Sequence, residues 1–216
     1  MKMNLFLPAL LAGMVTLSSC NKDDNKSSEQ NQGGASTNGG EKKIENLDAS
    51  KKQWVYFSFE KGTTVTPTTP ETDLTWDIAF NSYAVKLNGG TSGKGQAEAI
   101  SADSKDFAAV TKAPTGTFVK DKEGIELTLS YKPYQTITTS ASPLLTGGFG
   151  VTTGTIHIAP TNMPTWPSVY APTKNVYVLK TATGKLVKFQ VTDFYSDKKV
   201  AGFITFIYKV STDGNF

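Results

Sequence analysis

The chain contains 216 residues, which is enough for one or two domains, and its 22 basic residues nearly balance its 19 acidic residues. This balance argues against a protein that binds nucleic acid through a basic surface. With a single cysteine and a single histidine, the chain excludes internal disulfides, thiolate metal sites and zinc sites that need several histidines.

Residues 1–19 have the pattern of a lipoprotein signal peptide. Lys2 supplies the positive charge, Leu5–Leu17 is apolar but too short to span a bilayer, and Leu17-Ser18-Ser19-Cys20 matches the small-residue cleavage pattern. We therefore expect Cys20 to be acylated and to anchor the protein to the outer membrane, facing the extracellular side. The alternative is an ordinary secretory signal that happens to end near a cysteine.

Residues 20–46 are predicted to be the lipidated cysteine and a flexible polar linker, because they are rich in Asn, Lys, Asp, Ser, Gln and Gly and contain no aromatic residue. Lys22-Asp23-Asp24 resembles the charged surface-export signal of outer-membrane lipoproteins, and a plain polar linker explains it equally well. The folded domain is predicted to span residues 47–216.

This domain is predicted to be all-β and single, because short runs of β-branched and aromatic residues alternate with Gly, Pro, Asn and Thr, and no long run has a helical period. Residues 181–185 are expected to turn between two strands, with glycine in the turn. The predicted strands are Trp54–Phe59, Thr75–Phe80, Ala84–Leu87, Ile125–Tyr131, Gly154–Ile158, Val176–Thr181, Leu186–Tyr195 and Gly202–Val210.

Two segments are predicted to be loops. Residues 88–95 contain four glycines, which suits either an anion-binding nest or a plain turn. We favour the turn, because the segment lacks the Gly-Lys-Ser/Thr ending of a phosphate-binding loop.

The second loop, residues 159–172, contains four prolines, which keep it out of a central strand. It contains Met163, Trp166 and Tyr170, whose thioether and aromatic side chains would suit a flat ligand with a soft metal. The same side chains could instead fold back and cover the end of the β core, and without further information this is the more common arrangement.

Three stretches of the sequence resemble the HmuY family of haem-binding lipoproteins. Together they cover most of residues 48–210, and the middle of the domain matches least well. The stretches are Trp54-Val55-Tyr56-Phe57-Ser58-Phe59, Leu74-Thr75-Trp76-Asp77-Ile78-Ala79-Phe80 with its continuation to Gly95, and Tyr170 to Tyr208, which includes Phe189-Gln190-Val191-Thr192-Asp193.

The resemblance implies a hand-like all-β fold that captures haem and passes it to a TonB-dependent outer-membrane receptor. It also implies that Met163 is an iron ligand, because the family's second ligand lies thirteen residues before the valine that begins the next strand, here Val176. Trp166 and Tyr170 would then belong to the haem pocket, and Tyr170 follows Met163 at the family's spacing.

The first iron ligand of the family has no clear counterpart, because residues 131–142 contain neither His nor Met. Tyr134 is one weak candidate, since phenolate oxygen can bind ferric haem iron. His157 is the other, although its side chain should point away from Ile156 and Ile158, toward solvent. The iron would be held by Met163 alone, by Met163 with Tyr134, or not at all.

The function that these observations favour is haem capture without catalysis. One alternative is a HmuY-like module that has lost haem and binds another small ligand, a glycan or a protein partner. A glycan-binding lipoprotein would use Trp76, Trp166 and Tyr170 as stacking platforms. An enzyme is the least favoured class, because Asp77 has no acidic partner in its motif and no nucleophile–base pair is visible.

Overall fold

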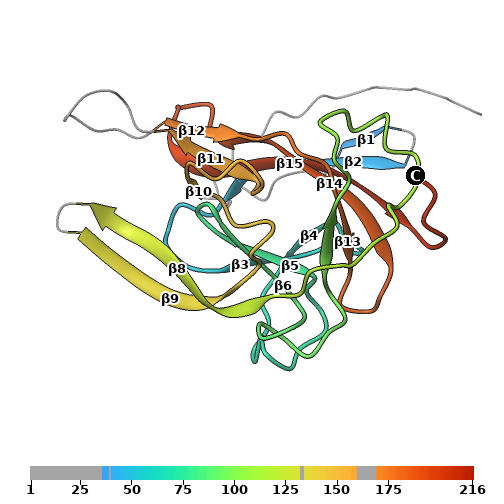
Figure 1. Ribbon diagram of the computed structural model, residues 1–216, viewed down its shortest axis with the longest axis horizontal. Coiled ribbons are helices and arrows are strands. Elements are labelled where there is room, and N and C mark those ends of the chain that lie inside the picture. Colours follow the sequence, from blue (N-terminus) through green and yellow to red (C-terminus); the bar gives the residue numbers. More distant parts are fainter. Residues whose placement is uncertain (1–35, 39, 132–133, 160–168) are drawn as a thin grey trace, which may run out of the picture.

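The computed structural model describes residues 36–38, 40–131, 134–159 and 169–216, and all regular structure in these ranges is β-strand (Figure 1). The predicted all-β class is therefore confirmed. In the described part of the chain, no helix is long and apolar enough to cross a membrane. Cys20 and the predicted signal peptide lie outside the described residues.

The largest sheet has six strands, and every neighbouring pair in it is antiparallel. In spatial order its strands are β1 (Ser36–Asn38), β2 (Glu41–Asp48), β15 (Ala201–Ser211), β14 (Leu186–Tyr195), β13 (Tyr177–Lys180) and β7 (Ala99–Ser101). A second antiparallel sheet contains β4 (Thr63–Val65), β3 (Val55–Ser58), β5 (Ile78–Asn81) and β6 (Ala84–Leu87), in that order.

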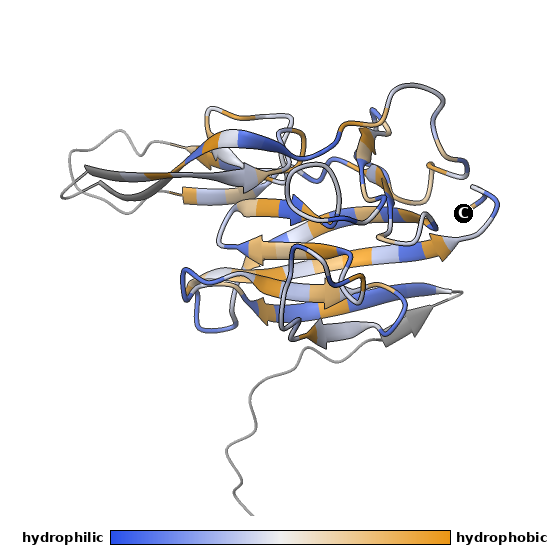
Figure 2. Cartoon of the chain, turned by 90° about the horizontal axis from the view of Figure 1, so that it is seen from below, coloured by the Kyte–Doolittle hydropathy of each residue, from blue (hydrophilic) through white to orange (hydrophobic). Residues whose placement is uncertain are grey.

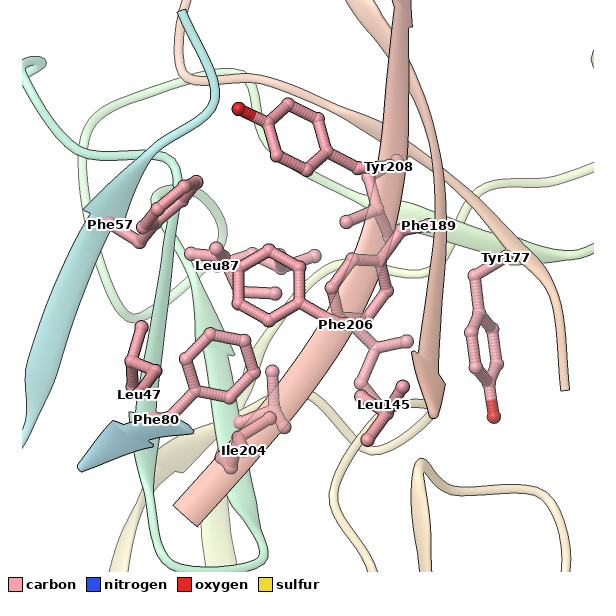
Figure 3. Close-up of a cluster of buried hydrophobic side chains, with 14 of the residues drawn as sticks. Leu47, Phe57, Phe80, Leu87, Leu145, Tyr177, Phe189, Ile204, Phe206 and Tyr208 are labelled. Atoms are coloured by element: carbon pink, nitrogen blue, oxygen red, sulfur yellow. The ribbon is translucent and has the colours of Figure 1, made fainter. Parts of the chain in front are cut away.

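The core is a layer of aromatic side chains between these two sheets (Figure 3). Phe206 of β15 lies at its centre, with ring centroids 5.2 Å from Phe57, 5.6 Å from Phe80 and 5.4 Å from Phe189. Figure 2 shows apolar and polar residues alternating along many strands, as a sheet with one buried face requires. Burial of each such ring contributes on the order of 1.5–3 kcal/mol, and each ring pair about 0.5–1.5 kcal/mol more.

Two strand pairs project toward the same end of the molecule (Figure 1). One is the hairpin of β8 (Lys122–Tyr131) and β9 (Tyr134–Ala141). The other is β11 (Ile156–Ala159) with β12 (Val169–Pro172), to which β10 (Gly148–Phe149) adds a short parallel strand. We call these the hairpin and the β11–β12 pair.

All eight predicted strands are present, and β6 and β14 have the predicted bounds. The predicted turn at residues 181–185 is confirmed, because Gly184 N–H donates to Thr181 O and Thr181 N–H to Lys185 O. The predicted loop 159–172 was wrong at its end, because Val169–Pro172 forms β12. This strand lies at the edge of the three-stranded sheet, in keeping with the prolines, which exclude a central strand.

Residues 36–38 and 41–46 were predicted to lie in the linker, and this was wrong, because they belong to β1 and β2. Ile44 and Leu47 are both buried in the core, at 2% and 3% exposure. They are three residues apart rather than two, since a register shift opposite Ile204 and Phe206 and a positive φ of 54° at Asn46 form a β-bulge. The bulge hides the period of two that would have indicated a strand.

The glycine-rich segment 88–95 forms a turn around Asn88, as predicted. The buried Asn88 side chain donates to Asp73 O and Trp76 O, and its Oδ1 accepts from Gly95 N–H. The amides of residues 89, 91, 92 and 94 donate to other backbone carbonyls. These N–H groups are therefore already used within the protein, which argues against an anion-binding nest.

Gly90→Ala should destabilise the protein much more than Gly124→Ala. Both glycines have positive φ, 58° and 81°, but a Cβ on Gly90 would lie 2.4 Å from Asp121 O, whereas one on Gly124 meets nothing within 4 Å. We expect a loss of about 1 kcal/mol for Gly124→Ala and at least about 3 kcal/mol for Gly90→Ala in urea unfolding. Equal losses would show that close packing at Gly90 does not matter.

Candidate functional site

An open pocket lies where the hairpin and the β11–β12 pair leave the body of the protein. Its cavity volume is about 140 Å³, and it opens to solvent. One wall comes from β8, another from β12, and the remaining sides from the β5–β6 turn and the segment after β2. The described lining residues are Ser50, Lys52, Asn81, Ser82, Tyr83, Ala84, Leu127 and Tyr170.

The apolar walls are Leu127 and Tyr170, one from each projecting pair. Tyr170 is half-buried, and its ring packs on Phe194 of β14 with the centroids 5.1 Å apart. Its backbone N–H donates to the hydroxyl of Tyr195 at 3.0 Å. Burial, and then the nearby Tyr195, raises the pKa of Tyr170, so its phenol is neutral at physiological pH.

The polar side of the pocket comes from Ser50, Lys52, Asn81 and Ser82. Ser50 is held in place, because its hydroxyl donates to Asp48 Oδ1 at 2.6 Å. Sequence reasoning did not find these four residues. They lie in two turns, about thirty residues apart in the sequence, that only the packing of the two sheets brings together.

The residues predicted from the sequence are placed as follows. Tyr170 lines the pocket, whereas Met163 and Trp166 lie outside the described residues. Tyr134 begins β9 and pairs with Tyr131 at the end of the hairpin, and its side chain is also outside the description. In Figure 1, this end of the hairpin and the ends of β11 and β12 point the same way.

His157 lies on β11, with its side chain on the opposite face from the buried Ile156 and Ile158, as expected. The ring is half-buried, and its Nδ1 lies 3.0 Å from the carbonyl oxygen of Val151. That contact requires a proton on Nδ1, because a carbonyl only accepts hydrogen bonds. His157 is not one of the described residues that line the pocket.

Trp76, which was considered as a sugar platform, is completely buried and cannot act as one. Its Nε1–H donates to Pro70 O at 2.8 Å. The ammonium of Lys86 lies 5.8 Å from the Trp76 ring, 5.2 Å from Tyr56 and 4.4 Å from Trp54. The ring thus belongs to a cluster of three aromatic residues around a buried lysine, which stabilises the outer face of the four-stranded sheet.

Other buried charges have structural roles. Asp77 accepts hydrogen bonds from Phe59 N–H and Ala182 N–H, both at 2.9 Å. It thereby connects the β13–β14 turn of the six-stranded sheet to the four-stranded sheet. Lys188 donates to the carbonyls of Phe107 and Val110. Within the described ranges, no group of three or more His, Cys, Asp or Glu side chains could hold a metal ion.

The hairpin is attached to β6 at both of its ends. Asp121, directly before β8, accepts from Leu87 N–H through Oδ2 at 2.8 Å. Directly after β9, Ser142 N–H donates to Val85 O at 2.8 Å. Asp121 is almost completely buried, and burial raises its pKa to about 7. The root of one pocket wall thus contains a carboxyl group that titrates near neutral pH.

Fold and pocket together define the class of protein: an all-β domain with two projecting strand pairs and an open pocket between their bases. The chain belongs to the HmuY family, because residues 50–208, most of its length, match the family described as HmuY protein. A comparison with curated proteins finds no significant match.

Solved structures share this fold at low sequence identity. The HmuY analogue TFO of Tannerella forsythia, solved in its apo form, is 18% identical with a TM-score of 0.53, covering 86% of this chain and 99% of its own. A Bacteroides vulgatus protein assigned as HmuY-like and haem-binding is 19% identical with a TM-score of 0.59, covering 79% and 91%. A Bacteroides fragilis protein assigned as a lipoprotein is 17% identical with a TM-score of 0.57, covering 79% and 89%.

Asp121→Asn should remove one component of the pH dependence of stability. The pKa of Asp121 is about 7 in the folded protein and about 3.9 when unfolded, so its contribution is fully present below pH 4 and is lost as the pH rises toward 7. The free energy of unfolding of Asp121→Asn relative to wild type should therefore increase from pH 4 to pH 7, by up to about 4 kcal/mol. Urea unfolding at several pH values measures this, and a difference that does not change with pH would contradict it.

Proposed function

We propose that the protein captures haem in the pocket between the hairpin and the β11–β12 pair and performs no chemistry on it. The observation that carries the proposal is the pocket itself, whose two apolar walls, Leu127 and Tyr170, come from different projecting pairs. Membership of the HmuY family supports haem as the ligand. The similar fold of the B. vulgatus protein assigned as haem-binding agrees with it.

Burial of the macrocycle would supply most of the affinity. Removing a few hundred Å² of apolar surface from water is worth several kcal/mol, at about 25 cal/mol per Å². Iron ligation would then fix the orientation of the haem. We propose Met163 as the ligand, since it lies in the connection between the two strands of one projecting pair. Its soft sulfur should bind ferrous iron better than ferric iron.

The second axial position of the iron would need another ligand. Tyr134 and His157 are the candidates, and the hydrogen bond from His157 Nδ1–H to Val151 O leaves Nε2 as the nitrogen that could bind iron. His157 is not among the described residues that line the pocket, which supports the alternative in which the family's pocket has been kept for a different apolar ligand or for a partner protein. The two functions differ in whether haem binds with saturation and whether Met163 affects its spectrum.

The cellular context is part of the same proposal. Acylation of Cys20 would anchor the protein to the outer membrane, facing the extracellular side, and the polar segment between Cys20 and β1 would link the domain to the membrane. Bound haem would then pass to a TonB-dependent receptor in the outer membrane. The similar fold of the B. fragilis protein assigned as a lipoprotein agrees with the anchor.

Haemin titration of the unlipidated domain tests the central claim. We expect a saturable Soret change at one haem per protein, tighter binding after reduction with dithionite, and loss of that redox preference in Met163→Ala. Equal affinity for both redox states would contradict ligation by Met163. A spectrum identical to free haemin in both states would contradict haem binding altogether.

Tyr170 supplies a second test, which concerns the wall rather than the iron. Tyr170→Ala should weaken haemin binding about 10-fold to 100-fold, because a large apolar surface is lost from the pocket. Tyr170→Phe should bind nearly as well as wild type, because it keeps the ring that packs on Phe194. Urea unfolding of both variants controls for a loss of stability, and equal affinity of Tyr170→Ala and Tyr170→Phe would exclude Tyr170 as a wall.

A further inference from the structure

We infer that the polar side of the pocket is a carboxylate subsite, in which Lys52, assisted by Asn81 and Ser82, binds a propionate group of the ligand. This inference rests on the proposed function and names the part of the ligand that the described residues recognise. It is carried by the charge of the pocket, by the backbone that holds the three residues and by the position of the apolar walls.

Among the described residues that line the pocket, one is positively charged and none is negatively charged. Lys52 is the only charged side chain among the described lining residues. The nearest carboxylate in the sequence, Asp48, is already used, because its Oδ2 pairs with Lys51 at 3.3 Å and its Oδ1 accepts from Ser50. Lys52 itself forms no ion pair in the described part of the chain, so its ammonium is available to a ligand.

The backbone at the polar side is strained and fixed. Lys52 and Ser82 have positive φ values of 55° and 53°, and in the described chain only four other non-glycine residues do. Such conformations are unfavourable for residues with a Cβ and persist where the surrounding structure imposes them, often at ligand sites. Two of these six residues line the same pocket, which indicates that their positions are imposed together.

Two backbone hydrogen bonds fix the positions of the turns that contain Lys52 and Ser82. Ser82 N–H donates to Ala49 O at 2.8 Å, and Ala49 N–H donates to Gly202 O at 2.9 Å. A Cβ on Gly202 would lie 2.8 Å from Ser50 Cα, so the turn after β2 packs closely on the start of β15. The turn that carries Lys52 and the turn that carries Ser82 are thereby joined to each other and to the large sheet.

The arrangement selects a ligand with an apolar body and an acidic end. Leu127 and Tyr170 provide the apolar walls, while an ammonium, an amide and a hydroxyl group supply hydrogen-bond donors at the polar side. A propionate carboxylate suits these donors, because charge-assisted hydrogen bonds are stronger than neutral ones. A neutral glycan would gain nothing from the unbalanced positive charge.

Titration of Lys52→Ala with haemin and with haemin dimethyl ester, in which both carboxylates are masked, tests the subsite. We expect Lys52→Ala to bind haemin about three-fold to tenfold more weakly than wild type, with the difference shrinking at high salt. Both proteins should bind the diester equally. Lys52→Arg should restore haemin affinity, because it keeps the charge.

Lys51→Ala is the matched control, because Lys51 is the exposed neighbour that pairs with Asp48 and does not appear among the described lining residues. It should bind haemin as wild type does. Equal haemin affinity of Lys52→Ala and wild type, or an equal loss for the diester, would overturn the subsite while leaving haem binding intact. Absence of saturable haemin binding by the wild type would overturn the proposed function, and the subsite with it.

Discussion

The aromatic layer between the two large sheets holds this protein together, because the described chain has no disulfide or metal site to assist it. Phe206 contacts rings from both sheets, and Tyr208 extends the layer toward Phe57 and Phe59. Close-packed rings admit one relative position of the sheets, since a shift would open voids that cost several kcal/mol. The two turns that form the polar side of the pocket are placed by this packing.

Away from the core, the structure becomes less constrained in a way that suits ligand capture. The β12 wall remains tied to the large sheet, because Tyr170 packs on Phe194 and donates to Tyr195. The hairpin is a two-stranded ribbon held to β6 at its root through Asp121 and Ser142. An isolated ribbon of this kind is marginally stable in water.

The sequence predicted those parts of the fold that local chemistry determines. Strands with a clean alternation, such as β14, were found with their bounds, and the turn at Gly184 followed from its glycine. β2 was missed because the bulge at Asn46 breaks its period, and Trp76 was misjudged because its burial depends on Pro70 and Lys86. No motif in the sequence around Lys52 or Ser82 predicts that these residues line a pocket. Only the packing of β5 and β15 brings their two turns together, and a single sequence does not encode that contact in any short motif.

The contacts of the buried charged groups show whether their shifted pKa values have a structural cause. Groups with strongly shifted pKa values usually mark catalytic sites. Here burial raises the pKa of Asp77 and Asp121 and lowers that of Lys188, but each of these groups holds a turn, a strand root or a loop. None of these three groups is among the described residues that line the pocket, which include the neutral Tyr170 and one lysine, Lys52. The shifted pKa values of these three groups are therefore accounted for by their structural contacts and do not by themselves locate a catalytic site.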